Sequence, residues 1–486
     1  MKLIEPKIKL LPQSQFNFGL ALWVKSVSIG FMLQGCSYFS PTESLPETVA
    51  IPREWSSQLS QASQTQAGLP SWVNEFSDTR LNELVSEAMQ HNPGMQRLLA
   101  GVAVADDQTW LAWSKFWPQL TGGFKSSRNK RNNAAGFAVS PRPINNFGVS
   151  LDFLWEIDLW YRLGNELEAT EHEKTAAESD LYAAQLSLAA NIAKSWFDVT
   201  EASQQLQLAE KTIQSFKHTL DIVEQGYNLG VYKPLDVRLA RSNLLGAEGR
   251  RENYLKIQDE AKRTLEFFLG RYPSANLTTT QQLPDIPLIV PASIPSELLE
   301  RRPDIVAAAE RFFATDQRLI KARKNMLPTI QLNGSVGTST KKLSDIFNPE
   351  NLIWNMAGSL TQPLFNGGQL FTEHSQAEAR VKQAAASYAE VVLQAFREVE
   401  TTLAAGQWLQ QQYSLLISEV TESREAVRLA EADYLTGLTD IVTLLESQRR
   451  ALDAESNLLE LNKQRLQNRV NLYLALGSPI VEPNKI

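Results

Sequence analysis

Histidines are the side chains best suited to metal or acid–base chemistry in this chain of 486 residues, and they are scattered. They are His91, His172, His218 and His374. Glu171-His172-Glu173 lacks a second histidine four residues further on, which a helical zinc site requires. No glycine-rich phosphate loop follows a stretch with strand periodicity. The sequence therefore predicts no enzyme, no cofactor and no metal site, and we expect each histidine to be a solvated helix residue.

The single cysteine, Cys36, excludes an intrachain disulfide and is explained by its context. A lysine-containing start and an apolar stretch precede small residues, as in a secretory signal. The end of this stretch, Leu33-Gln-Gly-Cys36, resembles the bacterial lipobox, in which the cysteine carries the lipid. We expect a signal peptide over 1–35 and a lipid-anchored linker over 36–71, with a fortuitous cysteine as the alternative. Because Ser37 follows the cysteine where an aspartate would suggest retention in the inner membrane, the outer membrane is favoured.

Any functional group of the chain must be positioned by long helices, which the sequence predicts in its long stretches without proline. Between Pro363 and Pro479 there is no proline, and apolar residues recur at steps of three and four, which predicts helix. A helix over about 369–434 would be roughly 100 Å long at ~1.5 Å per residue. A turn at 434–440 and a return helix over about 441–476 would complete an antiparallel hairpin.

Four segments instead alternate apolar and polar residues with a period of two, which predicts strands at 118–127, 146–156, 328–338 and 352–363. Each has about the ten residues that a tilted transmembrane strand needs, and no later apolar run approaches a membrane-spanning helix. A soluble hairpin remains an alternative. If the strands lie in lipid, four are too few to close a barrel, so we expect three copies to supply twelve.

Most of the chain consists of two similar units. Pro118 and Pro328 are 210 residues apart, and Gly230 and Gly437 are 207 apart. Each unit contains lead-in helices, a strand, a surface loop, a strand, a long helix, a turn and a return helix. The predicted boundaries are 72–272 for the first unit, with its tip turn at 227–236, a proline-rich connector at 273–296, the second unit at 297–477 and a tail at 478–486.

The composition is that of a folded protein, with 43% hydrophobic and 21% charged residues. A net charge of −7 gives no basic footprint, so nucleic acid is not an expected partner. The basic run from Lys321 to Lys324 is expected to be a solvated surface or a surface between protomers.

Several motifs resemble those of trimeric outer-membrane channel-tunnels of the TolC and OprM type, and more closely the NodT-like efflux lipoproteins. The matching segments are WEIDLW at 155–160, IPSELLERRPDIVAAAE at 294–310, LPTIQLNGSVG at 327–337 and TQPLFNGGQL at 361–370. One departure is Tyr161, where the family usually has glycine; Gly164 is the expected substitute at the bend.

The resemblance implies a membrane β-barrel of twelve strands joined to a long α-helical barrel of twelve helices, both shared by a homotrimer. It also implies passive export of drugs or other toxic compounds, with a periplasmic adaptor and an inner-membrane pump of the RND class as partners. A protein-secretion channel or a non-conducting scaffold lipoprotein are the alternatives.

The two tip turns are the candidate docking sites for the adaptor. Gly230 and Gly437 permit the left-handed backbone of a tight turn. Val231, Tyr232 and Leu438 beside them are expected to be exposed until another helical tip covers them.

The same end of the chain supplies the candidate entrance gate. Glu446 matches a position where the resembled family places an acidic ring, which would favour cations at a narrow pore. Asp236, Tyr434 and Arg241 are expected to form hydrogen bonds that hold the entrance shut.

Overall fold

The computed structural model describes residues 55–56, 72–130, 143–278, 282–286 and 295–479. The predicted signal peptide and Cys36 lie outside these residues, as do nearly all of the linker and most of the tail.

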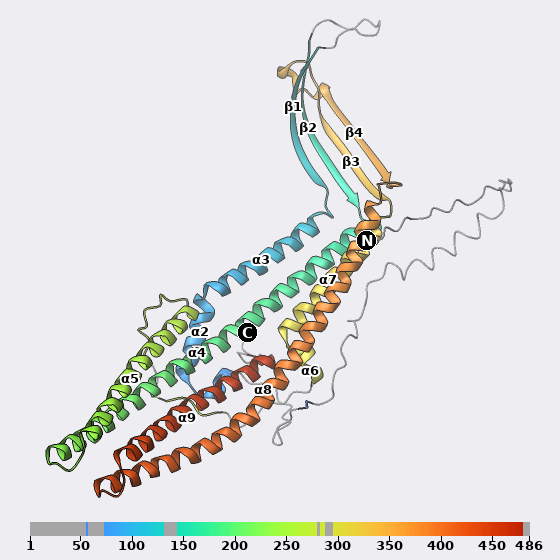
Figure 1. Cartoon of the computed structure of the whole chain (residues 1–486). Helices are drawn as coiled ribbons and strands as arrows, with labels where there is room; N and C mark the ends of the chain where they lie inside the picture. Colours follow the sequence, from blue (N-terminus) through green and yellow to red (C-terminus); the bar gives the residue numbers. More distant parts are fainter. Residues whose placement is uncertain (1–54, 57–71, 131–142, 279–281, 287–294, 480–486) are drawn as a thin grey trace, which may run out of the picture.

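Two antiparallel pairs of long helices dominate the chain, as Figure 1 shows. The helices α4 (Arg162–Asn228) and α8 (Gln369–Leu435) contain 67 residues each. Their return helices α5 (Pro234–Phe268) and α9 (Ile441–Ala475) contain 35 residues each. At ~1.5 Å per residue the two longer helices extend over roughly 100 Å, a length that the sequence predicted for α8. Among the described helices, none is long and apolar enough to cross a membrane.

Shorter helices lead into each long helix. Proline occupies the first position of both α3 (Pro93–Ser114) and α7 (Pro303–Lys324), where its missing N–H leaves no hydrogen bond unmade. The Asn92 side chain caps α3 by accepting hydrogen bonds from the backbone N–H groups of Gly94, at 2.7 Å, and Met95, at 3.3 Å. The remaining short helices are η2 (Trp72–Phe76), α2 (Thr79–His91), α6 (Pro295–Arg301), η3 (Leu343–Asp345) and η4 (Pro349–Asn351).

The four strands form one antiparallel sheet in the order β1-β2-β3-β4. Its strands are β1 (Gln119–Asn129), β2 (Ile144–Ile157), β3 (Thr329–Thr338) and β4 (Leu352–Thr361). Leu151 pairs with Gly122 on one side and with Val336 on the other, so the strands of the two units meet at β2 and β3. Large apolar side chains on the sheet are exposed, as Phe124 and Trp354 illustrate. The outer strands β1 and β4 each have one edge without a partner among the described residues.

The main core lies midway along the helices, where α2 and η2 pack against α4 and α9. Trp72 stacks on Tyr473 with 5.8 Å between ring centroids, and Phe76 meets Phe197 edge-on at 5.4 Å. The indole N–H of Trp196 donates to the Asp78 carboxylate at 2.7 Å, so this buried polar group is satisfied. These contacts hold the two hairpins together far from their tips.

The junction between β2 and α4 differs from the expectation based on Gly164. Tyr161 itself adopts the left-handed conformation, with φ of 60°, at the cap of α4. Gly164 provides space instead, because a Cβ there would lie 2.4 Å from the Tyr161 ring. Gly368, with φ of 86°, occupies the same cap position before α8. The first unit therefore makes the same bend with Tyr161, a residue for which the left-handed conformation is strained.

Candidate functional site at the helical tips

The turns between the paired helices lie at the end of the molecule opposite the sheet (Figure 1). Gly230 has φ of 80° and Gly437 has φ of 74°. In the first turn the N–H of Val231 donates to the Gly226 carbonyl at 2.8 Å; in the second the N–H of Leu438 donates to the Asp433 carbonyl at 2.8 Å. A Cβ at either turn glycine would meet nothing within 4 Å, so conformation rather than space requires glycine there.

Each return helix begins with a carboxylate cap. The N–H of Lys233 donates to Asp236 Oδ2 at 3.0 Å, and Pro234 occupies the first turn of α5. In the second unit Asp440 Oδ1 accepts a hydrogen bond from the N–H of Thr443 at 2.8 Å. This hydrogen bond lowers the pKa of Asp440 below its usual range. Both carboxylates thus stabilise the turns and, with them, the positions of the residues beside the glycines.

The tips expose large apolar side chains, as predicted for two of the three candidate docking residues. Val231 is 71% exposed and Leu438 is 78% exposed. Leu229, at 80%, and Leu235 and Val442 are exposed beside them and were not predicted. Their exposure could have been predicted from the sequence, because they are apolar residues in or next to a predicted turn. Contiguous apolar groups at an exposed helix end are typical of a surface that another protein covers.

Tyr232 was predicted to be an exposed docking residue, and this prediction is wrong. Its ring is half-buried and stacks on Tyr434 with 5.0 Å between centroids and 16° between planes. It also fills the space above Gly226, where a Cβ would lie 2.0 Å from the ring. Tyr232 belongs to the turn of the first hairpin and Tyr434 to the end of α8. The stack therefore joins the two tips to each other.

Asp236, Tyr434 and Arg241 do not form the predicted hydrogen bonds with one another. The Arg241 guanidinium donates to Glu224 at 2.5 Å, which ties α5 to α4, and Asp236 caps its own helix. Tyr434 is buried among apolar residues of both hairpins, including Val223 and Ala240. Burial raises the pKa of Tyr434, and the nearby Tyr232 and Asp236 add to this effect. Packing and stacking, rather than a hydrogen-bond network, hold these tips together within the chain.

Glu446 is exposed near the second tip and is paired with two arginines of its own helix. Its carboxylate lies 3.0 Å from Arg450 and 2.9 Å from Arg449. The hydrogen bond from Arg450 has the largest effect, and together with that from Arg449 it lowers the pKa of Glu446. The side chain lines a groove of about 800 Å³ between α8 and α9 whose other acidic residues are Glu419, Glu422, Asp440 and Asp453. The groove is therefore acidic, although the charge of Glu446 itself is partly compensated.

The basic run and one histidine lie in a contact that the sequence did not predict, between α4 and α7. His172 Nδ1 lies 2.6 Å from Glu310, so it is not the solvated residue expected. The Lys321 ammonium lies 2.6 Å from Glu166, and that of Lys324 donates to Asn165 at 2.6 Å. These cations thus bind within the chain. Across the described residues, no group of three or more histidines, cysteines and carboxylates could hold a metal ion.

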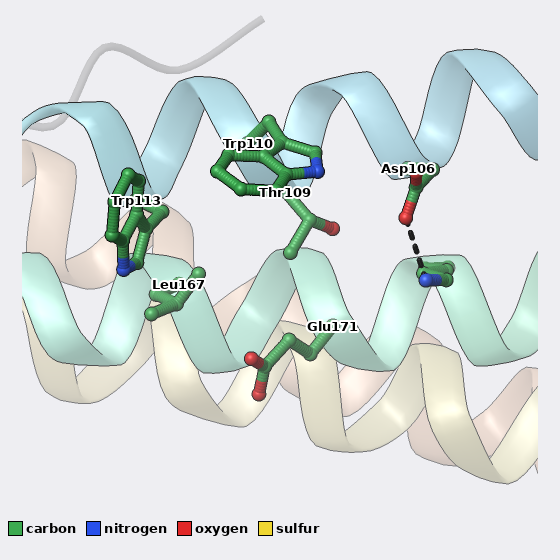
Figure 2. Close-up of a pocket in the computed structure, with 7 residues that line it drawn as sticks. Asp106, Thr109, Trp110, Trp113, Leu167 and Glu171 are labelled. Carbon is green, nitrogen blue, oxygen red and sulfur yellow. Dashed lines mark hydrogen bonds and ion pairs between the residues drawn. The ribbon is translucent and has the colours of Figure 1, made fainter.

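A second cavity, also not predicted, lies between α3 and α4 and has a volume of about 320 Å³. Figure 2 shows Trp110 and Trp113 of α3 above Leu167 and Glu171 of α4. Asp106, at one end, pairs with the Lys174 ammonium at 2.6 Å. Trp110 remains 60% exposed, which is unusual for so large an apolar group.

Long helical hairpins with apolar tips, joined to a small antiparallel sheet with exposed apolar side chains, define the class of outer-membrane channel proteins. The chain belongs to the outer membrane efflux protein family, which matches residues 84–271 and 294–478. It acts as an outer-membrane efflux channel, and the members of this family are channels rather than enzymes.

Known relatives resemble this chain over nearly their whole length. Cation efflux system protein CusC of Escherichia coli (strain K12) is 29% identical over 459 residues, which cover 92% of this chain and 97% of CusC. Probable outer membrane lipoprotein SilC of Salmonella typhimurium is 26% identical over 465 residues, covering 94% and 98%. The solved outer-membrane channel OprN is 25% identical with a TM-score of 0.83, covering 91% and 99%.

Proposed function

We propose that three copies of the chain form one channel, with a twelve-stranded barrel in the outer membrane and a tunnel of twelve long helices below it. Support comes from the sheet, because β1 and β4 each leave one edge without a partner among the described strands. Such edges cannot face lipid. In a ring, β4 of one copy pairs antiparallel with β1 of the next.

The tunnel is built from an internal duplication. The equal lengths of α4 and α8, and of α5 and α9, support two structural repeats per chain. Three chains then place six equivalent hairpins around one axis. This arrangement gives a conduit whose length is that of the long helices.

The tips dock a periplasmic adaptor that is joined to an inner-membrane pump, of the RND class. The observation that carries this proposal is the exposure of Val231 and Leu438 at the end of the molecule furthest from the sheet. A lipid on Cys36 anchors the chain to the outer membrane, in agreement with the similarity to the outer membrane lipoprotein SilC. The chain supplies no energy and needs no cofactor, because the pump drives transport.

Conduction is passive and is controlled by movement of the tips. Asp236, Arg241 and Tyr434 keep each hairpin in its closed position through the cap, the pair with Glu224 and the packed rings. Glu446 contributes to an acidic entrance that favours cations, in keeping with the five carboxylates of the groove that it lines. The cation named for CusC is one class of cargo that such an entrance admits; drugs and other toxic compounds are others.

Adaptor docking is tested by retention of the purified adaptor of the same efflux system on the immobilised channel. Leu438→Asp keeps the turn backbone and places a charge in the apolar contact, so we expect retention to fall at least tenfold. Gly230→Trp and Gly437→Trp should abolish it, together with export. Gly246→Trp is the matched control, because Gly246 on α5 is also exposed with open space around it. Retention that is unchanged in all three tip variants would show that docking occurs elsewhere.

A further inference from the structure

The contact between α4 and α9 joins the two hairpins of the chain (Figure 1), and its middle part is polar although both of its ends are apolar. Near the tips it contains the buried side chains of Val223 and Leu444. Towards the sheet it contains those of Trp196 and Val470, which belong to the main core. Between these two apolar parts lies a set of charged and amide side chains. Buried polar groups stabilise a contact only when they have partners, so their arrangement determines how firmly the hairpins are joined here.

Four charged side chains form the centre of this polar part and are called the seam cluster: Asp198 and Glu201 of α4, and Glu460 and Lys463 of α9. The Lys463 ammonium lies 2.7 Å from Glu460 on its own helix and 3.6 Å from each of the two α4 carboxylates. The side chains of Glu201 and Lys463 are only 8% and 16% exposed. One largely buried ammonium group therefore pairs with three carboxylates.

Amide side chains complete the hydrogen bonds of the seam cluster. The Gln467 amide donates to Asp198 at 2.9 Å, and the Gln205 amide donates to Glu201 at 2.8 Å. The Gln205 amide also donates to the backbone carbonyl of Ser456 at 2.9 Å, which ties α4 to α9. A protonated carboxyl group keeps acceptor capacity for such bonds, so a carboxylate of the cluster can gain a proton without losing its amide partner.

The neighbouring side chains leave the seam cluster with an excess of negative charge. Lys194 precedes Asp198 by about one turn of α4 and interacts with it electrostatically. From α5 the polar part is joined by Tyr254 and Gln258, which carry no charge and bond to serines of α9 and α4. On the side of α9 that faces α8, the Arg465 guanidinium lies over a tyrosine ring, 3.7 Å from its centroid. Among the described residues, three carboxylates thus face two ammonium groups, and one proton would balance the charge.

We infer that Asp198 and Glu201 bind one proton within the seam cluster, and that this proton tightens the contact between the two hairpins. Burial raises the pKa of both carboxyl groups, although Lys463 opposes the shift. For Glu460 burial is outweighed by the hydrogen bond from Lys463, and its pKa is lowered, so this group stays charged. The two α4 carboxyl groups share Lys463 as a neighbour and are expected to titrate as a pair.

Acid surroundings should therefore strengthen the contact between α4 and α9. A carboxyl group whose pKa is raised by folding stabilises the folded contact most at low pH, and this stabilisation is lost as the pH rises from the pKa of the unfolded state to the raised pKa. The seam cluster lies between the main core and the tips, so the two helices must loosen there when the tips move apart. We expect acid to hold the tips closed. This consequence rests on the proposed channel, whereas the proton site itself does not.

Infrared difference spectra of the purified protein between pH 8 and pH 5.5 test the proton site, because most ordinary carboxyl groups stay ionised at both values. The wild type should show absorption of a protonated carboxyl group at pH 5.5, and Glu201→Gln and Asp198→Asn should each reduce it. The matched control is Glu260→Gln, which removes an exposed carboxylate of α5 that lies 3.6 Å from Lys256. Its difference spectrum should equal that of the wild type.

Single-channel recording at the same two pH values tests the tightening. The open probability of the wild type and of Glu260→Gln should fall by about twofold or more from pH 8 to pH 5.5. Glu201→Gln is neutral at every pH, so its open probability should already be low at pH 8 and should change less on acidification. Asp198→Asn should act in the same direction.

The outcomes separate this inference from the proposed function. If the carboxyl absorption is equal in the wild type, Glu201→Gln and Asp198→Asn, the seam cluster binds no proton and the inference is wrong. The inference is also wrong if both variants lose the absorption but keep the pH dependence of the wild-type open probability. If no variant conducts while the absorption changes as expected, the proposed channel fails and the proton site stands.

Discussion

The stack of Tyr232 on Tyr434 is the contact that most directly holds the two tips of one chain together, and removing it should open the channel. The rings are 5.0 Å apart and nearly parallel, and Tyr434 is buried. Such a pair contributes about 1 kcal/mol beyond the area that it buries. In Tyr232→Ala this contribution is lost in every copy. If three tips open together, the closed state loses about 3 kcal/mol, on the order of a hundredfold in its equilibrium with the open state.

Single-channel recording of the purified protein in planar bilayers measures this change as an increase in open probability. Tyr227→Ala is the matched control, since Tyr227 lies in the same turn but is 45% exposed and outside the stack. Tyr434→Ala should act like Tyr232→Ala, and the double variant should add little, because both remove one interaction. An open probability for Tyr232→Ala equal to that of the control, in a protein of unchanged mass, would refute the role of the stack.

Three further changes test other parts of the account. Arg302→Met removes the buried partner of Asp304 and Glu398, whose own side chains are 40% and 38% exposed, and should lower the free energy of unfolding by about 2 kcal/mol in chemical denaturation. Arg428→Met on the surface should change it little. Burial raises the pKa of Asp198 despite its neighbour Lys463, so stability is lost as the pH rises from the pKa of the unfolded state to the raised pKa of the folded state, and stays lost above it. Asp198→Asn should therefore raise the melting temperature more at pH 8 than at pH 4, and an equal gain at both would contradict this. Glu446→Gln should weaken cation preference in reversal-potential measurements, by the same amount at pH 8 and at pH 5, because its lowered pKa keeps the wild-type group charged across that range.

The long helices and strands could be predicted because their signals are local and periodic. The absence of proline and a repeating apolar stripe identified α8 within a residue or so of its bounds, Gln369–Leu435. Alternation identified β2, and Gly230 and Gly437 identified the turns. Val231 and Leu438 followed because an apolar residue beside a turn glycine has little chain around it to bury it.

The contacts between helices could not be predicted, because they depend on how segments far apart in the chain face each other. Tyr232 and Val231 are neighbours in the same turn, and both have apolar side chains. The ring of Tyr232 is covered because Tyr434, about two hundred residues later in the chain, stacks on it. The same limit applies to Arg241, whose partner proved to be Glu224 on the opposite helix. His172 gave no local sign of Glu310, since one histidine on a helix is compatible with solvent or with a partner.

The mass of the protein extracted from outer membranes in mild detergent tests the central proposal most directly. The measurement is light scattering with the detergent contribution subtracted, and the full chain of 486 residues has a mass of 54.4 kDa. The proposed channel predicts a single species of three processed chains, which is the number that supplies twelve strands. A stable species of one or two chains would supply four or eight strands rather than the twelve of the proposed channel, and would contradict the account.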